Sequence, residues 1–519
     1  MEIIDNKYLA VRTRNPDKIQ NEIPSSEIIS TENDIYTIAV EWELQKSQQL
    51  RRLRIKNVPS PILRDYEWPG LYTPMAHQRT TAEFLTLHPR AYCFNEQGTG
   101  KTGAAIWASD YLMGKKYIRR VLVVCPLSIM QAAWQRDLFQ FAMHRKVGIA
   151  HGTRDKRKAV IQGDYDYVII NYDGVEIVAD EIAKGKFDLI IIDEANAYKT
   201  TTTKRWRTMK KLATENRWLW LMTGTPAAQS PADAYGLAKL CTPDTVPKFF
   251  GAWKESVMLN VSRFRWVPKS DAANKVHSVL QPAIRFEKKD CLDLPPIIYT
   301  DRDAPLTPQQ KKYYELLKKE FLMTAGDEEI TSANAAVNIS KLLQISGGAV
   351  YTNSGATVEF DVSNRLNVVD EVIEEASHKV LVFVPFSHTI DLLKAHLDKL
   401  RIPSEIISGA VSATKRNDII QRFQTKGEDD LKVLIIQPAA AAHGITLTAA
   451  DTIIWYAPCT SIETYLQANA RINRQGQQNA MTVVHITGSQ VESRLYAMLR
   501  DKLGNHEKLI DLYKNELTE

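Results

Sequence analysis

Residues 91–102 read Ala-Tyr-Cys-Phe-Asn-Glu-Gln-Gly-Thr-Gly-Lys-Thr. The apolar start predicts a short buried strand, and the pattern of residues 104–113 predicts a helix. A glycine-rich turn between a strand and a helix is the context that a phosphate-binding loop requires. Its glycines let backbone N–H groups surround phosphate oxygens, Lys101 neutralises the β- and γ-phosphates, and the Thr102 hydroxyl ligates Mg²⁺. These residues predict a nucleotide site.

Two adjacent carboxylates supply the second half of the predicted site. Asp193 and Glu194 follow the apolar run 189–192, and α/β sheets bind their ligands at the carboxyl ends of the strands. There Asp193 is suited to hold the hydration shell of Mg²⁺, and Glu194 to orient and deprotonate an attacking water. Asn95 stands where the full P-loop pattern has its first glycine. A chance glycine turn is the alternative, but the loop and the carboxylates together favour nucleotide hydrolysis.

The same arrangement of apolar run, polar turn and helical pattern recurs along the chain. Runs of four or five Val, Ile and Leu residues without alternation are typical of parallel strands buried on both faces. Helical stretches between them, such as 129–141, indicate βαβ units. The runs form two groups, 91–94, 121–125, 167–170, 189–192 and 219–222, then 380–384, 405–407, 433–436, 453–456 and 483–486. We therefore expect an α/β fold with two doubly wound parallel-sheet lobes.

The pattern also predicts the domain boundaries. We expect an N-terminal accessory region, a first lobe, a helical insertion or linker, a second lobe and a C-terminal helical tail, at residues 1–70, 71–245, 246–361, 362–490 and 491–519. In the segment between the lobes, a helix is expected to start at Pro308, with Thr307 as its N-cap.

The composition excludes several classes of protein. The 519 residues are 44% hydrophobic and 24% charged, and 66 Lys and Arg against 61 Asp and Glu give a net charge of +5. A surplus this small permits a polyanionic partner without arguing for one. No apolar run approaches the roughly 18 residues of a membrane span, and the five scattered cysteines match no disulfide framework or zinc site. We expect a cytoplasmic protein with no membrane partner.

The residues 193–196, Asp-Glu-Ala-Asn, resemble the DEAD/DEAH box of helicase superfamily 2. The chain from His77 to Gln478 resembles the SWI/SNF-type branch of that superfamily, the ATP-driven DNA translocases. The resemblance implies two tandem RecA-like lobes, ATP and Mg²⁺ as cofactors, and Thr102 and Asp193 as metal ligands. His77-Gln78 resembles the glutamine motif that reads adenine. The implied nucleotide-binding residues are His77, Gln78, Gln97, Gly98, Thr99, Gly100, Lys101, Thr102 and, in motif V of the second lobe, Gly444.

The end of the second lobe resembles motif VI, with Gln467, Arg471, Arg474 and Gln477. Arg471 and Arg474 are i, i+3 neighbours and share a helix face if the segment is helical. Two such arginines are ordinarily part of a solvated surface. The resemblance implies instead that they reach across a cleft and stabilise charge on the γ-phosphate. The implied catalytic set is Lys101, Asp193, Glu194, Gln467, Arg471 and Arg474.

Other motifs of the family line a groove that follows the phosphates of a DNA strand. The implied contacts are Pro126, Asn171, Tyr172, Ser387 and Thr446, with Thr223 and Thr225 of the Thr-Gly-Thr-Pro motif that links hydrolysis to movement. Such donors suit contact that is independent of DNA sequence. The cluster 204–207 adds basic charge, and its Trp206 is either a stacking surface or a packed residue. We expect the positive surplus to gather on this face.

The sequence departs from the family pattern at three places. Asn196 replaces the usual His or Asp of the box, which bears on the coupling of ATP to DNA. Arg365 stands where the family usually has Lys. The segment 246–361 is short, as in the compact motors of bacteria and their phages, for which chromatin is not the expected substrate.

The resulting prediction is a DNA-dependent ATPase that translocates along duplex or forked DNA and remodels DNA or protein–DNA complexes, with replication or recombination proteins as candidate partners. A strand-separating helicase is a close alternative, and its wedge would lie in 1–70 or 246–361. Further alternatives are a nucleic-acid-binding scaffold with an inactive nucleotide site, a P-loop kinase, and a restriction motor or nuclease. A kinase would lack the segment 467–477, and Glu41, Glu43 and Lys46 do not have the spacing of a metal nuclease.

Overall fold

The computed structural model describes residues 1–227, 230–262, 265–291, 293–327, 332–351, 357–425, 431–441, 445–474 and 476–500. The chain divides into two compact units, Met1–Cys291 and the described residues from 293 onward. Each unit has its own parallel sheet and its own hydrophobic core. Within the described residues, no helix combines the length and apolar character needed to cross a membrane.

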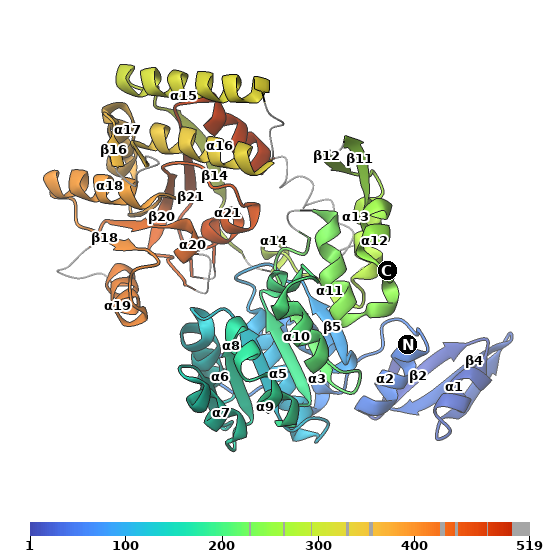
Figure 1. Ribbon diagram of the computed structural model, residues 1–519. Coiled ribbons are helices and arrows are strands. Elements are labelled where there is room, and N and C mark those ends of the chain that lie inside the picture. Colours follow the sequence, from blue (N-terminus) through green and yellow to red (C-terminus); the bar gives the residue numbers. More distant parts are fainter. Residues whose placement is uncertain are drawn as a thin grey trace. The chain divides into compact units, whose positions relative to one another are not determined.

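The first unit is built on a seven-stranded sheet in which all neighbouring strands are parallel (Figure 1). Met222 pairs with Cys93 on one side and with Asp193 on the other. The carboxyl ends of these three strands are therefore level, and the loops that follow them meet at one edge of the sheet. In spatial order the strands are β13 (Ala283–Ile284), β5 (Arg90–Cys93), β10 (Trp218–Met222), β9 (Leu189–Asp193), β6 (Val121–Cys125), β8 (Tyr167–Asn171) and β7 (Val147–Ala150).

Helices cover both faces of this sheet. Leu122 and Val124 lie in one core, whereas Val121 and Val123 lie in the other, because successive side chains of a strand point to opposite faces. Strands buried on both sides are the reason for the uninterrupted apolar runs in the sequence. The helices of the lobe are α4 (Ala76–Leu87), α5 (Lys101–Gly114), α6 (Arg136–Phe141), α7 (Arg154–Gln162), α8 (Tyr172–Ile177), α9 (Ala179–Lys184), α10 (Lys204–Leu212) and α11 (Ala234–Cys241).

The predicted helical stretch 129–141 is present, but its first part is a π-helix. Met130–Gln135 form this π-helix, which continues into α6. Trp134 and Leu138 are fully buried, so the predicted apolar face is the one that packs. π-Helical turns are rare and are frequent at functional sites, and Trp134 contacts the site described below.

The segment 246–361 is shared between the two units, and it contributes an edge strand to each parallel sheet. Its helix α15 starts at Pro308 as predicted, and the Thr307 hydroxyl accepts a hydrogen bond from the Gln310 amide at 3.4 Å. In the first unit the segment forms α12 (Phe250–Val257), β11 (Met258–Ser262), β12 (Arg265–Pro268), α13 (Ala272–Val279), β13 and α14 (Lys288–Cys291). In the second unit it forms β14 (Ile297–Asp303), α15 (Pro308–Asp327), α16 (Ser332–Gly347), β15 (Ala349–Tyr351) and β16 (Thr357–Glu359).

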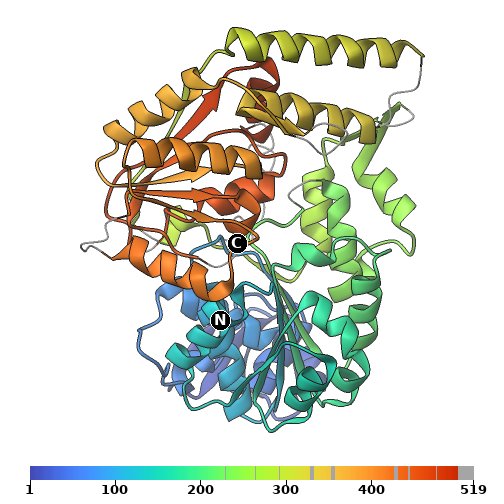
Figure 2. The ribbon, with the colours of Figure 1, turned by 60° about the vertical axis from the view of Figure 1, so that its left-hand side comes forward.

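The second unit contains a six-stranded sheet that is also parallel throughout (Figure 2). The two parallel sheets with their helices confirm the predicted fold class. The strand order is β14, β21 (Met481–Thr487), β20 (Ala450–Trp455), β17 (Lys379–Phe383), β19 (Val433–Ile436) and β18 (Ser404–Ile407). The helices that follow β16 are α17 (Ser363–Glu375), α18 (Ser387–Lys399), α19 (Ala413–Gln424), α20 (Pro438–Ala441) and α21 (Ile462–Asn469), and residues 490–500 are also helical.

A buried ion pair ties this last helix to the second unit. The Arg365 guanidinium on α17 donates to both carboxylate oxygens of Glu492, at 2.7 and 2.8 Å. Glu492 also accepts from the amides of Gly488 and Ser489. Both bonds to Glu492 come from Nη2 of Arg365, and Nη1 donates to the Tyr456 carbonyl oxygen. Arg365, which stands where the resembled family usually has Lys, therefore uses both terminal nitrogens of its guanidinium, which an ammonium group does not offer.

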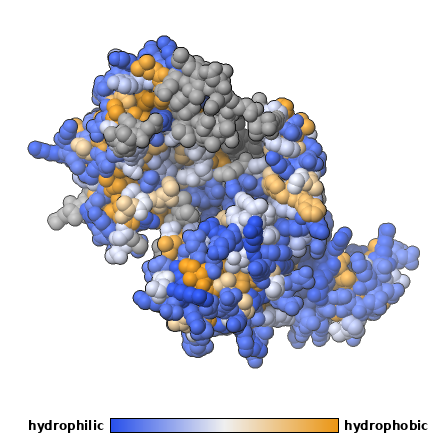
Figure 3. All heavy atoms as spheres, in the orientation of Figure 1, coloured by the Kyte–Doolittle hydropathy of each residue, from blue (hydrophilic) through white to orange (hydrophobic). Residues whose placement is uncertain are grey.

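The N-terminal region is a small antiparallel sheet with its own core, which includes Leu9, Ile38 and Leu50. Its helices α2 and α3 contact α4, and Leu44 and Ile62 extend into the core of the first lobe. The surface seen in Figure 3 is mostly hydrophilic over this region. Its elements are β1 (Glu2–Ile4), β2 (Tyr8–Thr13), α1 (Pro16–Glu22), β3 (Glu27–Glu32), β4 (Ile35–Glu41), α2 (Leu44–Arg52) and α3 (Ile62–Asp65).

Candidate nucleotide site

The glycine-rich loop runs from the end of β5 to the start of α5 and has the conformation that a phosphate cradle needs. Gly98 and Gly100 have φ values of 88° and 79°, in the left-handed region that glycine adopts without strain. A Cβ on Gly100 would lie 2.0 Å from Nε2 of Gln78. The backbone shape therefore favours glycine at position 100, and any larger residue would also displace the Gln78 side chain.

The predicted adenine-reading residues, His77 and Gln78, contact the loop itself. Nε2 of His77 lies 2.8 Å from the Thr99 carbonyl oxygen, and the Gln78 amide donates to the same oxygen at 3.4 Å. Oε1 of Gln78 accepts from the Met75 amide at 2.9 Å. The start of α4 thus holds the loop in place.

Lys101 and Gln97 carry polar groups that the lobe does not satisfy. The Lys101 side chain is buried, with 9% of the residue exposed, and no residue of the described chain hydrogen-bonds to its ammonium group. Both polar atoms of the buried Gln97 amide also lack a partner there. An ammonium group without a hydrogen-bond partner in the described lobe, at the start of a helix, is available to an anion. Thr102 follows in the first turn of α5.

Asn95, which replaces a glycine of the P-loop pattern, has a structural role. Its Nδ2 donates to the Thr81 hydroxyl on α4 at 2.8 Å, and its Oδ1 accepts from the Phe286 amide at 3.0 Å. The side chain therefore joins the loop to α4 and to the chain that follows β13.

Asp193 lies at the end of β9 with both carboxylate oxygens oriented by hydrogen bonds. Oδ2 accepts from Nε1 of Trp134 at 2.9 Å, and Oδ1 accepts from the Glu194 amide at 3.0 Å. Burial raises the pKa of the Cys93 thiol to about 11, and Lys101 and Asp193 act on it with opposite signs. The predicted ammonium and carboxylate therefore both lie near the end of β5, and a carboxylate fixed in this way is suited to Mg²⁺.

Glu194 has a strained backbone, with a φ of 48° in the left-handed region. Non-glycine residues adopt this conformation rarely, and such strain is concentrated at functional sites. The Tyr172 hydroxyl donates to the carbonyl oxygens of Asp193 and Glu194, at 2.6 and 3.1 Å. These bonds hold the turn that orients the two carboxylates.

Asn196 links the acidic motif to the Thr-Gly-Thr-Pro motif. Its Nδ2 donates to the Thr225 carbonyl oxygen at 2.9 Å and to the Thr225 hydroxyl at 3.1 Å. Thr225 in turn donates its amide to the Thr223 hydroxyl at 3.3 Å. The asparagine that departs from the usual box is therefore a direct connection between the two motifs.

Arg285 makes a second connection, which the sequence did not indicate. Its buried guanidinium, 2% exposed, donates through Nη1 to the Gly224 carbonyl at 2.6 Å and also to the Phe94 carbonyl. The Glu96 carboxylate accepts from the Lys288 amide at 2.8 Å. Residues 285–288 are thus hydrogen-bonded to the residues that lead into the glycine-rich loop. No sequence pattern indicates this role, because Arg285 is an isolated Arg in a segment expected to be an insertion.

The predicted motif VI arginines lie in the turn that follows α21, because the helix ends at Asn469. The segment of the two arginines is therefore not helical, and the condition for a shared helix face is not met. Arg471 is buried and donates to the carbonyls of Gln467 and Ile445, at 2.9 and 3.1 Å. Arg474 is half-buried and donates to the Thr446 hydroxyl at 3.2 Å. The structure brings Gln467, the two arginines and Thr446 together, while Gly444 lies outside the described residues.

Most of the residues that were predicted to contact DNA from the first lobe are hydrogen-bonded to, or buried among, other residues of that lobe. Asn171 accepts from Nη1 of the buried Arg157 at 2.9 Å. Tyr172 serves the acidic motif, and Thr223 and Pro126 are buried. In the second lobe, Ser387 is exposed at the start of α18.

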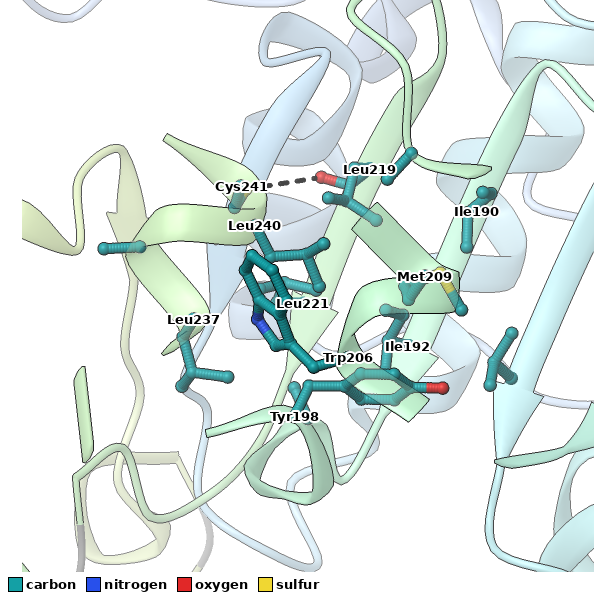
Figure 4. Close-up of a cluster of buried hydrophobic side chains, with 14 of the residues drawn as sticks. Ile190, Ile192, Tyr198, Trp206, Met209, Leu219, Leu221, Leu237, Leu240 and Cys241 are labelled. Carbon is teal, nitrogen blue, oxygen red and sulfur yellow. Dashed lines mark hydrogen bonds between the residues drawn. The ribbon is translucent and has the colours of Figure 1, made fainter. Parts of the chain in front are cut away.

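The basic cluster 204–207 is helical, and two of its three cations have carboxylate partners. Lys204 pairs with Glu176 at 3.3 Å, and Arg205 with Asp173 at 2.7 Å. Trp206 points into the core beside Leu237 and Leu240, and its Nε1 donates to the Gly236 carbonyl at 2.9 Å (Figure 4). Trp206 is therefore a packed residue and offers no stacking surface.

The fold and site define a two-lobed P-loop protein whose acidic motif and threonine motif surround the nucleotide loop. Residues 40–346 match the SNF2-related domain, and residues 364–476 match the helicase conserved C-terminal domain. The chain therefore belongs to the SNF2-related family.

Several known proteins are similar to this chain. A chromodomain-helicase-DNA-binding protein 1-like of Mus musculus is 26% identical over 434 residues, which cover 79% of this chain and 46% of the relative. An uncharacterized ATP-dependent helicase of Mycoplasma genitalium is 26% identical over 419 residues, covering 79% of this chain and 39% of the relative. The chain thus spans less than half the length of these relatives. The Sulfolobus solfataricus SWI2/SNF2 ATPase core in complex with dsDNA is 22% identical, with a TM-score of 0.41, over 85% of this chain and 94% of that one.

Proposed function

We propose that this chain is a DNA-dependent ATPase that translocates along DNA and remodels DNA structures or protein–DNA complexes in replication, recombination or repair. The observation that carries the proposal is the buried Lys101, which lacks a hydrogen-bond partner in the described chain at the sheet edge where Asp193 also lies. A cation in a glycine loop at the start of a helix suits the phosphates of ATP. Membership of the SNF2-related family supports ATP as the nucleotide.

The residues of the first lobe fit ATP and Mg²⁺. Thr102 and Asp193 would hold the metal, which supplies positive charge to the phosphates when it is bound. The hydrogen bonds from Trp134 and from the Glu194 amide keep the Asp193 carboxylate oriented. Glu194 is the residue suited to orient a water molecule and accept its proton.

The second lobe supplies positive charge through motif VI. We infer that Arg474 is the arginine that would bind the γ-phosphate, because it is the less buried of the two arginines. Arg471 and Gln467 build the turn that presents it, since Arg471 donates to the Gln467 and Ile445 carbonyls. A guanidinium placed in this way stabilises charge in the transition state.

The proposed track is duplex or forked DNA, bound without regard to its sequence. Because the side chains of Asn171 and Tyr172 are engaged within the first lobe, backbone N–H groups there would supply the phosphate contacts, with Ser387 and Thr446 in the second lobe. Replication or recombination proteins are the partners that such a motor would meet.

The test is the ATPase rate of the full chain with single-stranded, duplex and forked DNA, and with RNA, across a salt series. DNA should stimulate the rate, and the stimulation should weaken steeply with salt, because phosphate contacts release counterions. Lys101→Ala and Glu194→Gln should each abolish turnover. DNA-stimulated hydrolysis that persists in both variants would contradict the proposal.

We also propose that the chain is a compact motor of the bacterial or phage type that acts in the cytoplasm on DNA free of nucleosomes. The similarity to a helicase of Mycoplasma genitalium and the short connection between the two sheets support this. Stimulation by naked DNA that equals or exceeds stimulation by nucleosomes, and recovery from the cytoplasmic fraction, would agree with it.

A scaffold with an inactive nucleotide site is the weaker alternative, because Lys101, Asp193, Glu194 and Arg474 are all present. A strand-separating helicase is a close alternative, and a strand-displacement assay beside a triplex-displacement assay would separate it from a motor that leaves the strands paired.

A further inference from the structure

Gln97 is a buried residue of the glycine-rich loop whose amide group has no partner within the described part of its lobe. It directly precedes Gly98 and is 7% exposed. Its Oε1 and Nε2 atoms are enclosed, and neither makes a hydrogen bond with a residue of the described chain. The amide therefore has a donor group and an acceptor oxygen that the fold leaves unused.

The other polar side chains of this part of the loop are all hydrogen-bonded. The Asn95 amide has two partners. The Glu96 carboxylate accepts from the Lys288 amide at 2.8 Å, and the Thr99 hydroxyl donates to the Glu96 carbonyl oxygen at 2.8 Å. Gln97 is the exception among them.

Folding alone gives no reason for a glutamine at this position. An enclosed amide without a partner has lost its hydrogen bonds to water, which lowers the free energy of unfolding. A methionine or leucine side chain of similar size would be buried there without that cost. An unsatisfied buried group in a native protein calls for an explanation, and a catalytic role is one of the few available.

The Gln97 side chain lies against the Thr-Gly-Thr-Pro motif. A Cβ on Gly224 would lie 3.1 Å from Cγ of Gln97 and 3.3 Å from its backbone nitrogen, so the two segments are in close contact. The motif follows β10, which lies between β5 and β9 in the sheet. β5 leads into the loop, and β9 ends at Asp193. The Gln97 side chain is therefore on the side of the loop that faces the strand of the acidic motif.

We infer that Gln97 is a further catalytic residue of ATP hydrolysis, which binds the γ-phosphate and the attacking water. Nε2 donates to a γ-phosphate oxygen, and Oε1 accepts a hydrogen bond from the water. The water oxygen forms a bond to the γ-phosphorus, the bond from that phosphorus to the oxygen of the leaving ADP breaks, and the proton of the water passes to Glu194. The inference rests on the proposed ATPase and adds a residue to its site.

The amide reaches the phosphate by rotation of its own side chain. No hydrogen bond within the described chain holds the amide against Gly224, so turning it breaks no polar contact of the fold. Three residues of the same loop separate Gln97 from Lys101, the cation suited to the β- and γ-phosphates. A glutamine side chain on this loop is long enough to approach the phosphate that Lys101 neutralises.

The experiment replaces the amide by an apolar side chain of similar size in the full chain. Gln97→Met and Gln97→Leu remove both polar atoms, and the matched control Asn95→Leu removes an amide that has two partners. The Gln97 variants should melt at or above the wild-type temperature without nucleotide, because they break no hydrogen bond of the described chain. Asn95→Leu should melt at a clearly lower temperature.

The same Gln97 variants should lose catalysis and keep the binding of ADP. We expect the turnover number at saturating ATP and DNA to fall about 100-fold, the scale of one lost group that acts on the transition state. ADP affinity, measured by isothermal titration calorimetry, should stay within about twofold, because ADP has no γ-phosphate. The non-hydrolysable analogue AMPPNP should bind about tenfold more weakly, as expected for the loss of a hydrogen bond to a charged group.

Two results would overturn the inference. The first is an unchanged turnover number in both Gln97 variants. The second is a parallel loss of ADP and AMPPNP affinity together with a lower melting temperature, which would show that Gln97 supports the loop by packing.

Failure of the proposed function gives a different result. A wild-type chain whose ATP hydrolysis is not stimulated by DNA would contradict the proposed function, and the basal rates of the Gln97 variants would still decide the role of this residue. A wild-type chain that does not hydrolyse ATP at all would overturn both.

Discussion

Nη1 of Arg285 lies 2.6 Å from the carbonyl oxygen of Gly224 and donates also to the carbonyl of Phe94. One buried cation thus joins the strand that leads into the glycine loop to the motif that follows β10. Because Arg285 lies six residues before the end of the first unit, this contact connects the nucleotide loop to the chain that leads into the second lobe. The two carbonyls and Arg285 are expected to move together.

Arg285→Met should destabilise the first unit, because it leaves buried carbonyl groups without a donor. We expect the free energy of unfolding to fall by about 2–4 kcal/mol. Urea denaturation measures the loss, and Arg285→Lys, which keeps one donor, should lose less. Equal stability of the Met variant and the wild type would show that the contact is dispensable.

Lys101→Ala should abolish ATP turnover without destabilising the chain. The Lys101 ammonium has no hydrogen-bond partner in the described residues, so its removal breaks no polar contact of the fold. We expect a melting temperature equal to or above that of the wild type in the absence of nucleotide, and no increase when ATP is added. A clear drop in the melting temperature would mean that Lys101 has a structural role.

Glu492→Gln should weaken the second unit. The buried Arg365 would keep its charge but lose the carboxylate partner, and removal of one member of a buried pair costs about 3–5 kcal/mol. Replacement of both residues, Arg365→Met with Glu492→Leu, should cost less than the single change. A double-mutant cycle by urea denaturation checks this, and simple additivity would contradict it.

Asn196→Ala should uncouple hydrolysis from DNA. The Asn196 amide is the donor that reaches Thr225, while Asp193 and Glu194 keep their positions. We expect basal ATP hydrolysis to change little and DNA stimulation to fall by about 5- to 100-fold, the range of a typical coupling free energy. Asn196→Asp is the sharper control, because a carboxylate cannot donate to the Thr225 carbonyl.

The stability of the first unit should depend on pH through His88. Burial, the largest effect, lowers the pKa of His88 from 6.5 to about 4. The hydrogen bond to the Phe84 carbonyl raises this pKa and the charge of Arg51 lowers it, both by less. The unfolded chain therefore binds more protons than the folded chain between these two values, so stability falls as pH drops from 6.5 toward 4. We expect a loss of about 2 kcal/mol across this window. His88→Gln should reduce the slope of the free energy of unfolding against pH. An unchanged slope would show that another titrating group causes the pH dependence.

The buried strands could be predicted from the sequence because each of them is apolar on both faces. The runs 121–125 and 189–192 became parallel strands for this reason, and the loop 98–102 was recognisable because its residues are contiguous. Edge strands carry a weaker signal. β13 is only two residues long, and β14 alternates with exposed residues, so both were included in a presumed helical insertion.

The predicted uses of single side chains depended on neighbours that lie far away in the sequence. Tryptophan is a residue type that stacks on bases, but the helix α10 directs the Trp206 side chain toward the core, where it packs beside Leu240. Asn95 departs from a glycine pattern, but it pairs with Phe286, which is 191 residues away. No local pattern contains such partners.

The sequence by itself determined two parallel α/β lobes, the nucleotide loop and the acidic motif, because these follow from contiguous residues and from the period of apolar runs. Only the tertiary structure decided that Arg285 hydrogen-bonds to Phe94 and Gly224, that Arg471 and Arg474 lie in a turn, and that Trp206 packs into the core. Hydrogen bonding and charge neutralisation are pairwise properties, and a pair is defined only when folding brings its two members together.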